Sequence, residues 1–186
     1  MPVAERQQSS QQLCDALLAW FKTRALLRAP TSEIVAGFWP LTYEPDLRPL
    51  FQQLHAAGTT VTLPVVATKH APLEFHVWRP EDSLKPGAFG VMEPTQGAVM
   101  LPTVLLVPTL GFSDQGARLG YGGGYYDRTL AQLNQTGCPF KAIGIAWDQA
   151  RLSKEDQHAA QPHDYPLDAV LTPSGWISDK TLSELG

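Results

Sequence analysis

The feature of this sequence that most constrains its fold is the uninterrupted apolar run VLLV at residues 104–107. A strand with one face in solvent alternates apolar and polar residues, whereas a strand covered on both faces is apolar throughout. The run therefore predicts a strand inside a covered sheet. Further short, mostly apolar runs predict companion strands at residues 34–39, 61–66, 142–146 and 169–171.

Segments between these strands repeat apolar residues at helical spacing. Leu13, Leu17 and Trp20 form such a stripe within residues 11–28, and further helices are predicted at residues 47–54 and 125–133. Residues 73–78 instead alternate apolar and polar side chains, as a strand does. Strands that alternate with helices predict an α/β fold with a Rossmann-like, open, mostly parallel sheet and helices on both faces. Ligands bind such sheets at the carboxyl ends of the strands, near the topological switch point.

The organisation along the chain is simple. The polar residues 1–10 are expected to form a flexible tail, and residues 11–186 a single α/β domain, since no repeat or linker divides them. Residues 79–102 are rich in Pro and Gly and predict a long loop with one strand near residues 89–92. Loops of this length in compact domains are usually functional or mobile.

Composition narrows the function classes. A formal net charge of -4 gives no general attraction to nucleic acid or anionic membranes, so neither is an expected partner. No apolar run approaches the roughly 20 residues of a spanning helix, and the N-terminus lacks the apolar core of a signal peptide. A soluble, cytoplasmic protein is expected. Cys14 and Cys138 have no clustered partners, which predicts two ordinary thiols and neither a zinc site nor a disulfide framework.

A glycine-rich segment is the most informative part of the chain. Residues 118–128 read RLGYGGGYYDR, after an apolar strand and before a helix. Glycines let a phosphate approach the backbone, and a helix N-terminus offers unpaired N–H groups. Arg118 and Arg128 would add charge-assisted hydrogen bonds. No GK[ST] follows and Tyr125 breaks the GxGxxG pattern, so the motif alone predicts an anion-binding turn. The alternative is a tight connection without a ligand, although a simple turn needs fewer glycines.

With its surroundings, this segment resembles the signature of 5-formyltetrahydrofolate cyclo-ligases, also called methenyltetrahydrofolate synthetases. The resemblance extends in order over residues 34–173. Its pieces are FWP at 38–40, EPD at 44–46, LP at 63–64, GVMEP at 90–94, VPTLGF at 107–112, IGIAW at 143–147 and PHD at 162–164.

The resemblance implies an open α/β fold (NagB/RpiA/CoA-transferase-like) that binds ATP and a reduced folate in adjacent clefts. It also implies an enzyme that uses Mg-ATP to convert 5-formyltetrahydrofolate to 5,10-methenyltetrahydrofolate, releasing ADP and phosphate. The formyl oxygen attacks the γ-phosphorus of ATP, N10 then closes the ring, and phosphate leaves. Positioning and charge neutralisation do most of the catalysis in phosphoryl transfer. The expected partners are small molecules, and the expected working form is a monomer.

The same resemblance implies the site residues. Arg118 and Tyr125 are the expected catalytic residues. The expected ATP segment is Arg118, Leu119, Gly120, Tyr121, Gly122, Gly123, Gly124, Tyr125 and Tyr126. The expected folate contacts are Leu41, Glu44, Asp46, Tyr121, Gly122, Gly123, Gly124 and Tyr125. Asp127 and Asp164 are expected to hold Mg²⁺, which proteins bind through one or two carboxylates together with phosphate oxygens.

These residues also have structural interpretations. Asp127 would complement the positive end of a helix, Asp164 would cap a turn, and Glu44 would be an ordinary turn residue. Tyr125 and Tyr126 would pack at the start of a helix.

Two other functions stay open at this point. Family members normally begin with a helix whose Lys and Arg reach ATP, and residues 1–12 carry only Arg6. A non-catalytic relative that binds folate or nucleotide is therefore one alternative. The other is a sugar-phosphate isomerase or acyl-transferase on a similar scaffold, with Glu93 as its carboxylate base. The roles of Glu93 and His163 stay open.

Overall fold

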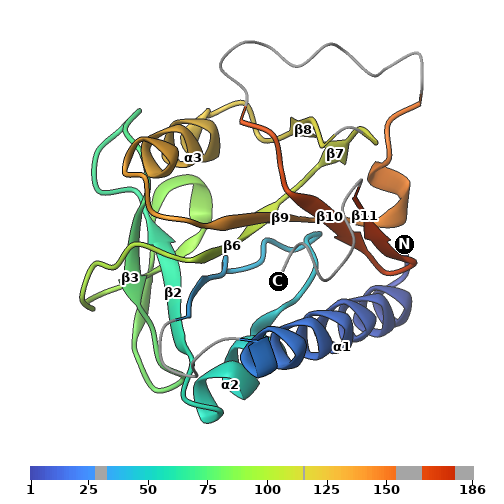
Figure 1. The fold of residues 1–186 in the computed structure, drawn as a ribbon, viewed down its shortest axis with the longest axis horizontal. Coiled ribbons are helices and arrows are strands. Elements are labelled where there is room, and N and C mark those ends of the chain that lie inside the picture. The colour runs from blue at the N-terminus through green and yellow to red at the C-terminus, as the bar shows by residue number, and fades with distance from the viewer. Residues whose placement is uncertain (28–32, 115, 154–164, 179–186) are drawn as a thin grey trace.

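The computed structural model of the protein describes residues 1–27, 33–114, 116–153 and 165–178. Its centre is a seven-stranded sheet in the order β11–β10–β9–β6–β1–β2–β3 (Figure 1). These strands are β1 (Ile34–Ala36), β2 (Thr60–Val65), β3 (Glu74–Val77), β6 (Val104–Pro108), β9 (Lys141–Ile145), β10 (Ala169–Thr172) and β11 (Gly175–Ile177). The helices are α1 (Val3–Leu27), α2 (Arg48–Ala56) and α3 (Tyr125–Gln135).

The five central strands are parallel, and the two edge strands are not. Val35 of β1 pairs with Val61 of β2 on one side and with Val104 of β6 on the other. The edge strands β3 and β11 run antiparallel to β2 and β10. The chain passes from β1 to β2 and later returns to β6 on the far side of β1. The strand order therefore reverses between β1 and β6, the switch point where doubly wound sheets bind ligands. The predicted α/β fold is confirmed.

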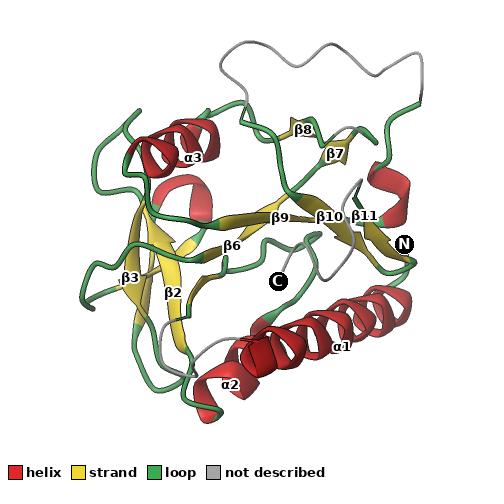
Figure 2. Cartoon of the chain, viewed as in Figure 1, coloured by secondary structure: helices red, strands yellow, loops and turns green. Residues whose placement is uncertain are grey.

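Helices cover both faces of the sheet, as predicted. Figures 1 and 2 show α1 and α2 on one face and α3 on the other. Along β6, Val104 and Leu106 belong to the core cluster that contains α1 and α2, whereas Leu105 and Val107 belong to the cluster under α3. This period of two places one apolar residue on each face in turn, which explains why the strand is apolar throughout.

The first helix begins earlier than the sequence pattern indicates. Residues 1–10 were expected as a flexible tail, but α1 already starts at Val3. Ala, Glu, Arg and Gln are good helix formers even without an apolar stripe. The segment is also anchored, because the buried Ser10 hydroxyl accepts the Asp46 N–H at 3.0 Å and the Arg6 guanidinium lies 5.4 Å from the centre of the Tyr43 ring.

The long loop at residues 79–102 and the connection after β6 both contain small hairpins. In the loop, β4 (Leu84–Pro86) pairs with β5 (Met92–Pro94), so the strand expected near residues 89–92 begins only at Met92. After β6, β7 (Gly111–Phe112) pairs with β8 (Arg118–Leu119). The glycine-rich loop therefore follows β8 and not an apolar strand, because a two-residue strand has too short a pattern to read.

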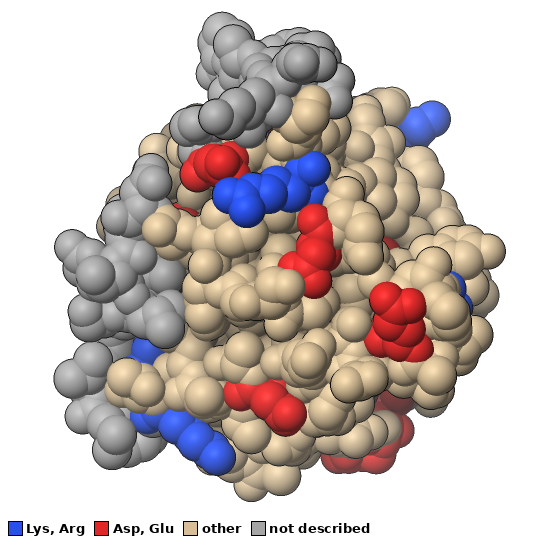
Figure 3. Space-filling view, turned by 90° about the vertical axis from the view of Figure 1, so that its right-hand side faces the viewer, with Lys and Arg blue, Asp and Glu red and all other residues tan. Residues whose placement is uncertain are grey.

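The surface carries scattered charge. On the face shown in Figure 3, the basic and acidic side chains of the described residues lie in small groups among uncharged residues. Among the helices of the described segments, none has the length and apolar character that a membrane span requires.

Candidate active site

A pocket of about 1020 Å³ opens at the switch point of the sheet. Its lining comes from four stretches of chain that lie far apart in sequence. They are the loop after β1 (Phe38, Trp39, Leu41, Glu44), the end of β2 and its loop (Pro64, Val66, Leu73), the β4–β5 hairpin (Ala88, Phe89, Val91, Glu93) and the segment from Arg118 to Ala131. Of the described residues, Pro108 and Tyr165 also line it. The volume leaves room for two ligands of moderate size in adjacent positions.

The glycine-rich loop forms one side of the pocket. Gly122 and Gly124 have φ angles of 77° and 64°, in the left-handed region that favours glycine. Gly124 directly precedes α3, and Arg128 donates to the Gly123 carbonyl at 2.7 Å. A Cβ at Gly124 would lie 2.6 Å from Nη1 of Arg128. Glycine at position 124 thus allows both the turn into α3 and the close approach of the arginine.

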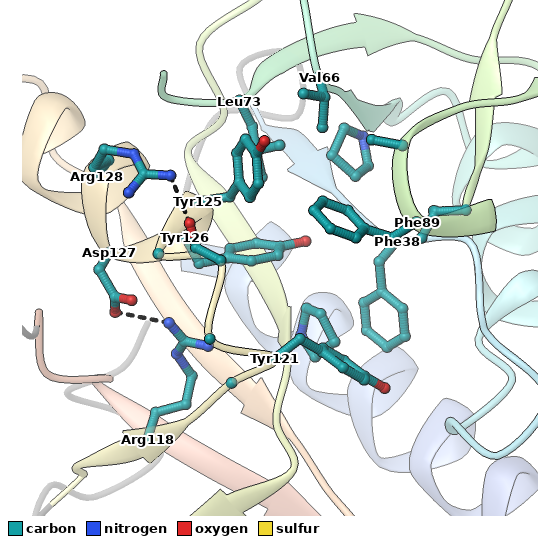
Figure 4. Close-up of a pocket in the computed structure, with 18 of the residues that line it drawn as sticks. Phe38, Val66, Leu73, Phe89, Arg118, Tyr121, Tyr125, Tyr126, Asp127 and Arg128 are labelled. Atoms are coloured by element: carbon teal, nitrogen blue, oxygen red, sulfur yellow. Dashed lines mark hydrogen bonds and ion pairs between the residues drawn. The ribbon is translucent and has the colours of Figure 1, made fainter. Parts of the chain in front are cut away.

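Two arginines give this side of the pocket its positive charge. Nη2 of Arg118 lies 2.7 Å from Oδ1 of Asp127, and the Arg118 side chain is only 5% exposed. Figure 4 shows this ion pair beside Arg128 at the start of α3. The guanidinium of Arg118 lies 5.7 Å from the Tyr126 ring centre, and that of Arg128 lies 5.1 Å from the Tyr125 ring centre. Together with the helix N-terminus, these cations are suited to hold an anion.

Tyr125 and Tyr126 project from the first turn of α3 into the pocket (Figure 4). The Tyr125 hydroxyl accepts the His70 N–H at 3.3 Å, and its ring centre lies 5.8 Å from that of Phe89. Burial raises the pKa of Tyr126, whose hydroxyl has no hydrogen-bond partner among the described residues. An unpaired buried hydroxyl is costly, so a ligand that pairs with it gains affinity.

Glu44 is the acceptor on the opposite wall. Its Oε2 accepts the Leu41 N–H at 2.7 Å, and its Oε1 accepts the Tyr121 hydroxyl at 2.8 Å. Burial raises the pKa of Glu44, while these two hydrogen bonds act in the opposite direction. The aromatic residues Phe38 and Trp39, from the same loop as Glu44, also line the pocket. This wall is suited to a flat ligand with N–H donors at its edge.

Most of the residues predicted for the site lie together. Every residue from Arg118 to Asp127 lines the pocket, as do Leu41 and Glu44. Asp46 does not: its carboxylate accepts from the Arg48 side chain at 2.6 and 2.8 Å and from the Arg48 N–H at 3.1 Å, at the start of α2. The expected contact of Asp46 with folate is therefore not supported. Asp164 lies outside the described residues.

Of the two carboxylates predicted to hold Mg²⁺, Asp127 is the one that lies within the described residues. There, no group of three or more His, Cys, Asp or Glu side chains converges to hold an ion. Asp127 nevertheless lines the pocket beside the glycine-rich loop, with its side chain 22% exposed. One carboxylate beside a phosphate site fits Mg²⁺, which takes most of its ligands from phosphates and water.

Sequence patterns did not identify Phe89, Val66 and Leu73 as pocket residues. Phe89 is 75% exposed and has a φ of 58°, and its ring contacts Tyr125 across the pocket. The proline- and glycine-rich composition of residues 79–102 predicted a long loop that is functional or mobile, but no pattern indicated which of its side chains faces the site.

The fold and the pocket together define an α/β protein whose pocket joins a glycine-rich loop, flanked by two arginines, to an apolar cleft with a carboxylate at its edge. Residues 4–173 match the model of the 5-formyltetrahydrofolate cyclo-ligase family. The chain belongs to this family, which confirms the resemblance seen in the sequence.

Named relatives agree with this assignment. The chain is 33% identical to 5-formyltetrahydrofolate cyclo-ligase of Mycolicibacterium smegmatis, over 88% of this chain and 83% of the relative. It is 35% identical to the Escherichia coli K12 protein of the same name, over 82% and 85%. The fold also matches 5,10-methenyltetrahydrofolate synthetase of Aquifex aeolicus, with a TM-score of 0.73 and 24% identity over 97% of this chain and 86% of that one.

Proposed function

We propose that this protein is a 5-formyltetrahydrofolate cyclo-ligase, which uses ATP to form 5,10-methenyltetrahydrofolate with release of ADP and phosphate. Family membership and relatives named for this activity support the proposal. The structural observation that carries it is one pocket that joins a positive, glycine-rich loop to an apolar cleft ending in Glu44. This is the arrangement required to bring a nucleotide phosphate against a folate.

In this proposal, the phosphates of ATP lie on the segment from Arg118 to Tyr126. The N–H groups at the start of α3 and the guanidinium groups of Arg118 and Arg128 neutralise their charge. The turns at Gly122 and Gly124 leave space for the phosphates near the backbone. Tyr125, on the same turn, lies close enough to contact the transferring group.

The folate lies in the apolar part of the pocket. Its pterin carries an amino group and ring N–H groups, which are donors, and Glu44 is the matching acceptor. Leu41 and the aromatic side chains of Phe38 and Trp39 support a flat ring beside this carboxylate. Burial of the ring against these side chains supplies affinity, while Glu44 supplies orientation.

Catalysis follows from this placement of the two ligands. The formyl oxygen attacks the γ-phosphorus, the bond to ADP breaks, and the formyl carbon becomes an activated electrophile. N10 then bonds to this carbon, and phosphate leaves. Arg118 and Arg128 stabilise the charge that develops on the phosphoryl oxygens, and the pocket holds the reactants in contact. Asp127 would hold Mg²⁺, which supplies further charge neutralisation when bound.

The test is a direct assay. Purified protein with 5-formyltetrahydrofolate and Mg-ATP should produce the methenyl chromophore and ADP in equal amounts, as the phosphoryl-transfer mechanism requires. Chelation of divalent metal should stop both. Folate binding without release of ADP would contradict the proposal and favour a non-catalytic binding protein.

We also propose a cytoplasmic location and a monomeric working form. Both cysteines are free thiols, Cys14 buried and Cys138 exposed, which suits a reducing compartment. Light scattering of the purified protein, with and without substrates, tests the monomer.

A further inference from the structure

Among the described residues, three carboxylates line the pocket, and two of them already have partners. Glu44 accepts hydrogen bonds on both of its oxygens, from the Leu41 N–H and from the Tyr121 hydroxyl. Asp127 is ion-paired with Arg118. The third is Glu93 on β5, which the proposed binding of ATP and folate leaves without a role.

Glu93 is buried yet only half paired. The residue is 6% exposed, and its Oε1 accepts the Val66 N–H at 3.1 Å. Its Oε2 has no hydrogen-bond partner within the described ranges, nor does Glu93 form an ion pair there. Oε2 is not a fully enclosed atom, so it is open to the pocket that Glu93 lines.

The backbone fixes the position of this carboxyl group. A Cβ on Gly87 would lie 2.0 Å from Cδ of Glu93 and 2.4 Å from each carboxylate oxygen, so the group lies directly against the Gly87 main chain. The Val66 N–H holds it from the carboxyl end of β2. Contacts from Gly87 and Val66 thus hold the carboxyl group in place, with Oε2 open to the pocket.

Glu93 lies on the wall away from the phosphate site. Figure 4 shows Val66, its hydrogen-bond partner, across the pocket from Arg118 and Asp127. An anionic base in this position is separated from the negative phosphoryl group and is not neutralised by an arginine. The second condition matters for a base, because pairing with a cation favours the charged carboxylate and so weakens its ability to take a proton.

We propose that Glu93 is the catalytic base that accepts the N10 proton during ring closure; this role rests on the proposed function. The lone pair of N10 forms the new C–N bond to the activated formyl carbon, and N10 becomes positively charged. Its proton passes to Oε2 of Glu93, which becomes a neutral carboxylic acid. The C–O bond then breaks, phosphate leaves with the electron pair, and the methenyl cation remains. Glu93 returns its proton to water when the product departs.

Glu93→Gln tests this role, because the amide oxygen can still accept the Val66 N–H while the base is lost. Rapid mixing with 5-formyltetrahydrofolate and Mg-ATP separates ADP formation from the methenyl absorbance. We expect ADP to form in a burst of about one per active site, and the methenyl phase to slow by at least about 100-fold. The dissociation constant for folate should stay within about threefold of wild type.

The matched control is Glu81→Gln, the same chemical change at an exposed residue outside the pocket lining, which should leave both phases unchanged. Glu93→Ala with added formate is the second variant. Formate should accelerate only the methenyl phase, and a chloride salt at equal ionic strength should not.

Four results would overturn the role of Glu93. They are a methenyl phase of Glu93→Gln close to that of wild type, weakened folate binding with normal ring closure, equal slowing of both phases, and a folded Glu93→Ala variant that formate does not accelerate. Failure of the proposed function looks different, because wild-type protein itself would then produce neither ADP nor the methenyl product.

Discussion

The hydroxyl of Tyr121 donates a hydrogen bond of 2.8 Å to Oε1 of Glu44, which lies 77 residues earlier in the chain. This contact joins the glycine-rich loop to the loop after β1, the two segments that we propose bind ATP and folate. A pterin that donates to Glu44 competes with Tyr121 for the same oxygen. Folate binding is therefore expected to release the Tyr121 hydroxyl from Glu44. The Tyr121 side chain would then be free to move on the side of the pocket proposed for the nucleotide.

Glu44→Gln should weaken folate binding specifically. Loss of a charge-assisted hydrogen bond costs about 1.5–3 kcal/mol, so the KM for 5-formyltetrahydrofolate should rise at least about tenfold while the KM for ATP stays near its wild-type value. Asp46→Asn is the matched control, since this carboxylate pairs with Arg48 and does not line the pocket. Steady-state kinetics with each substrate varied checks both. A larger effect of Asp46→Asn on folate would reverse the assignment.

Glu44 should also make stability depend on pH. Burial raises its pKa above the ordinary value of 4.5, so between 4.5 and the raised value the folded protein binds more protons than the unfolded chain. The contribution of Glu44 to stability is then present at low pH and is lost as pH rises through this window. Thermal unfolding of wild type and Glu44→Gln across acidic pH measures it. We expect the Tm of wild type, relative to that of Glu44→Gln, to fall as pH rises through this window. A relative Tm that rises with pH would show that the fold stabilises the charged carboxylate.

Gly124→Ala should impair nucleotide binding more than it impairs the fold. A left-handed φ costs a non-glycine residue about 1–2 kcal/mol, and the new Cβ would push Arg128 from its place. Gly58→Ala is the control, because Gly58 has a φ of 85° with nothing within 4 Å of its Cβ position, outside the pocket. Unfolding experiments should show similar losses of stability for the two variants. ATP titration should show weaker binding only for Gly124→Ala. Equal ATP affinities would mean that Arg128 does not contact phosphate.

Asp127→Asn should raise the Mg²⁺ concentration needed for activity by at least about tenfold, since a ligand charge is removed. Turnover should fall and folate affinity should change little. Asp114→Asn removes the partner of Arg151 in an exposed ion pair outside the pocket, and it should leave the Mg²⁺ dependence unchanged. Measuring activity as a function of Mg²⁺ concentration compares Asp127→Asn with Asp114→Asn. Asp164→Asn should resemble Asp127→Asn with a smaller effect, because water can replace one peripheral ligand.

A different outcome would assign Asp127 another role. Full Mg-ATP activity together with a lower Tm would mean that Asp127 acts only through its ion pair, by holding Arg118 in place.

The sheet could be predicted because its strands are buried on both faces. Continuous apolar runs such as VLLV at residues 104–107 have no other common explanation in a chain with interleaved helical stripes. The hairpins β4–β5 and β7–β8 could not be predicted, since strands of two or three residues are too short to show an alternating pattern. The early start of α1 was missed because residues 3–10 rely on propensity and on contacts with the loop at residues 43–46, not on an apolar stripe.

The pocket was predicted less completely than the sheet. The glycine-rich loop has a distinctive composition, and its position before α3 was correct. The direction of single side chains was not encoded locally: Asp46 turns to Arg48, while Glu44, two residues earlier, turns to Tyr121. Phe89 reaches the pocket only through a positive φ in a turn between two short strands, which sequence spacing does not reveal.

The four stretches of chain that line the pocket also determine when it forms during folding. Phe38 and Tyr165 stand at the two ends of the described lining in sequence, so no fragment that lacks either half of the sheet contains the binding surface. A chain emerging from the ribosome has no pocket until the segment after β8 has been made and packed. Bound ligand should therefore stabilise only the completed sheet, and it should slow hydrogen exchange in β1 and in α3 together.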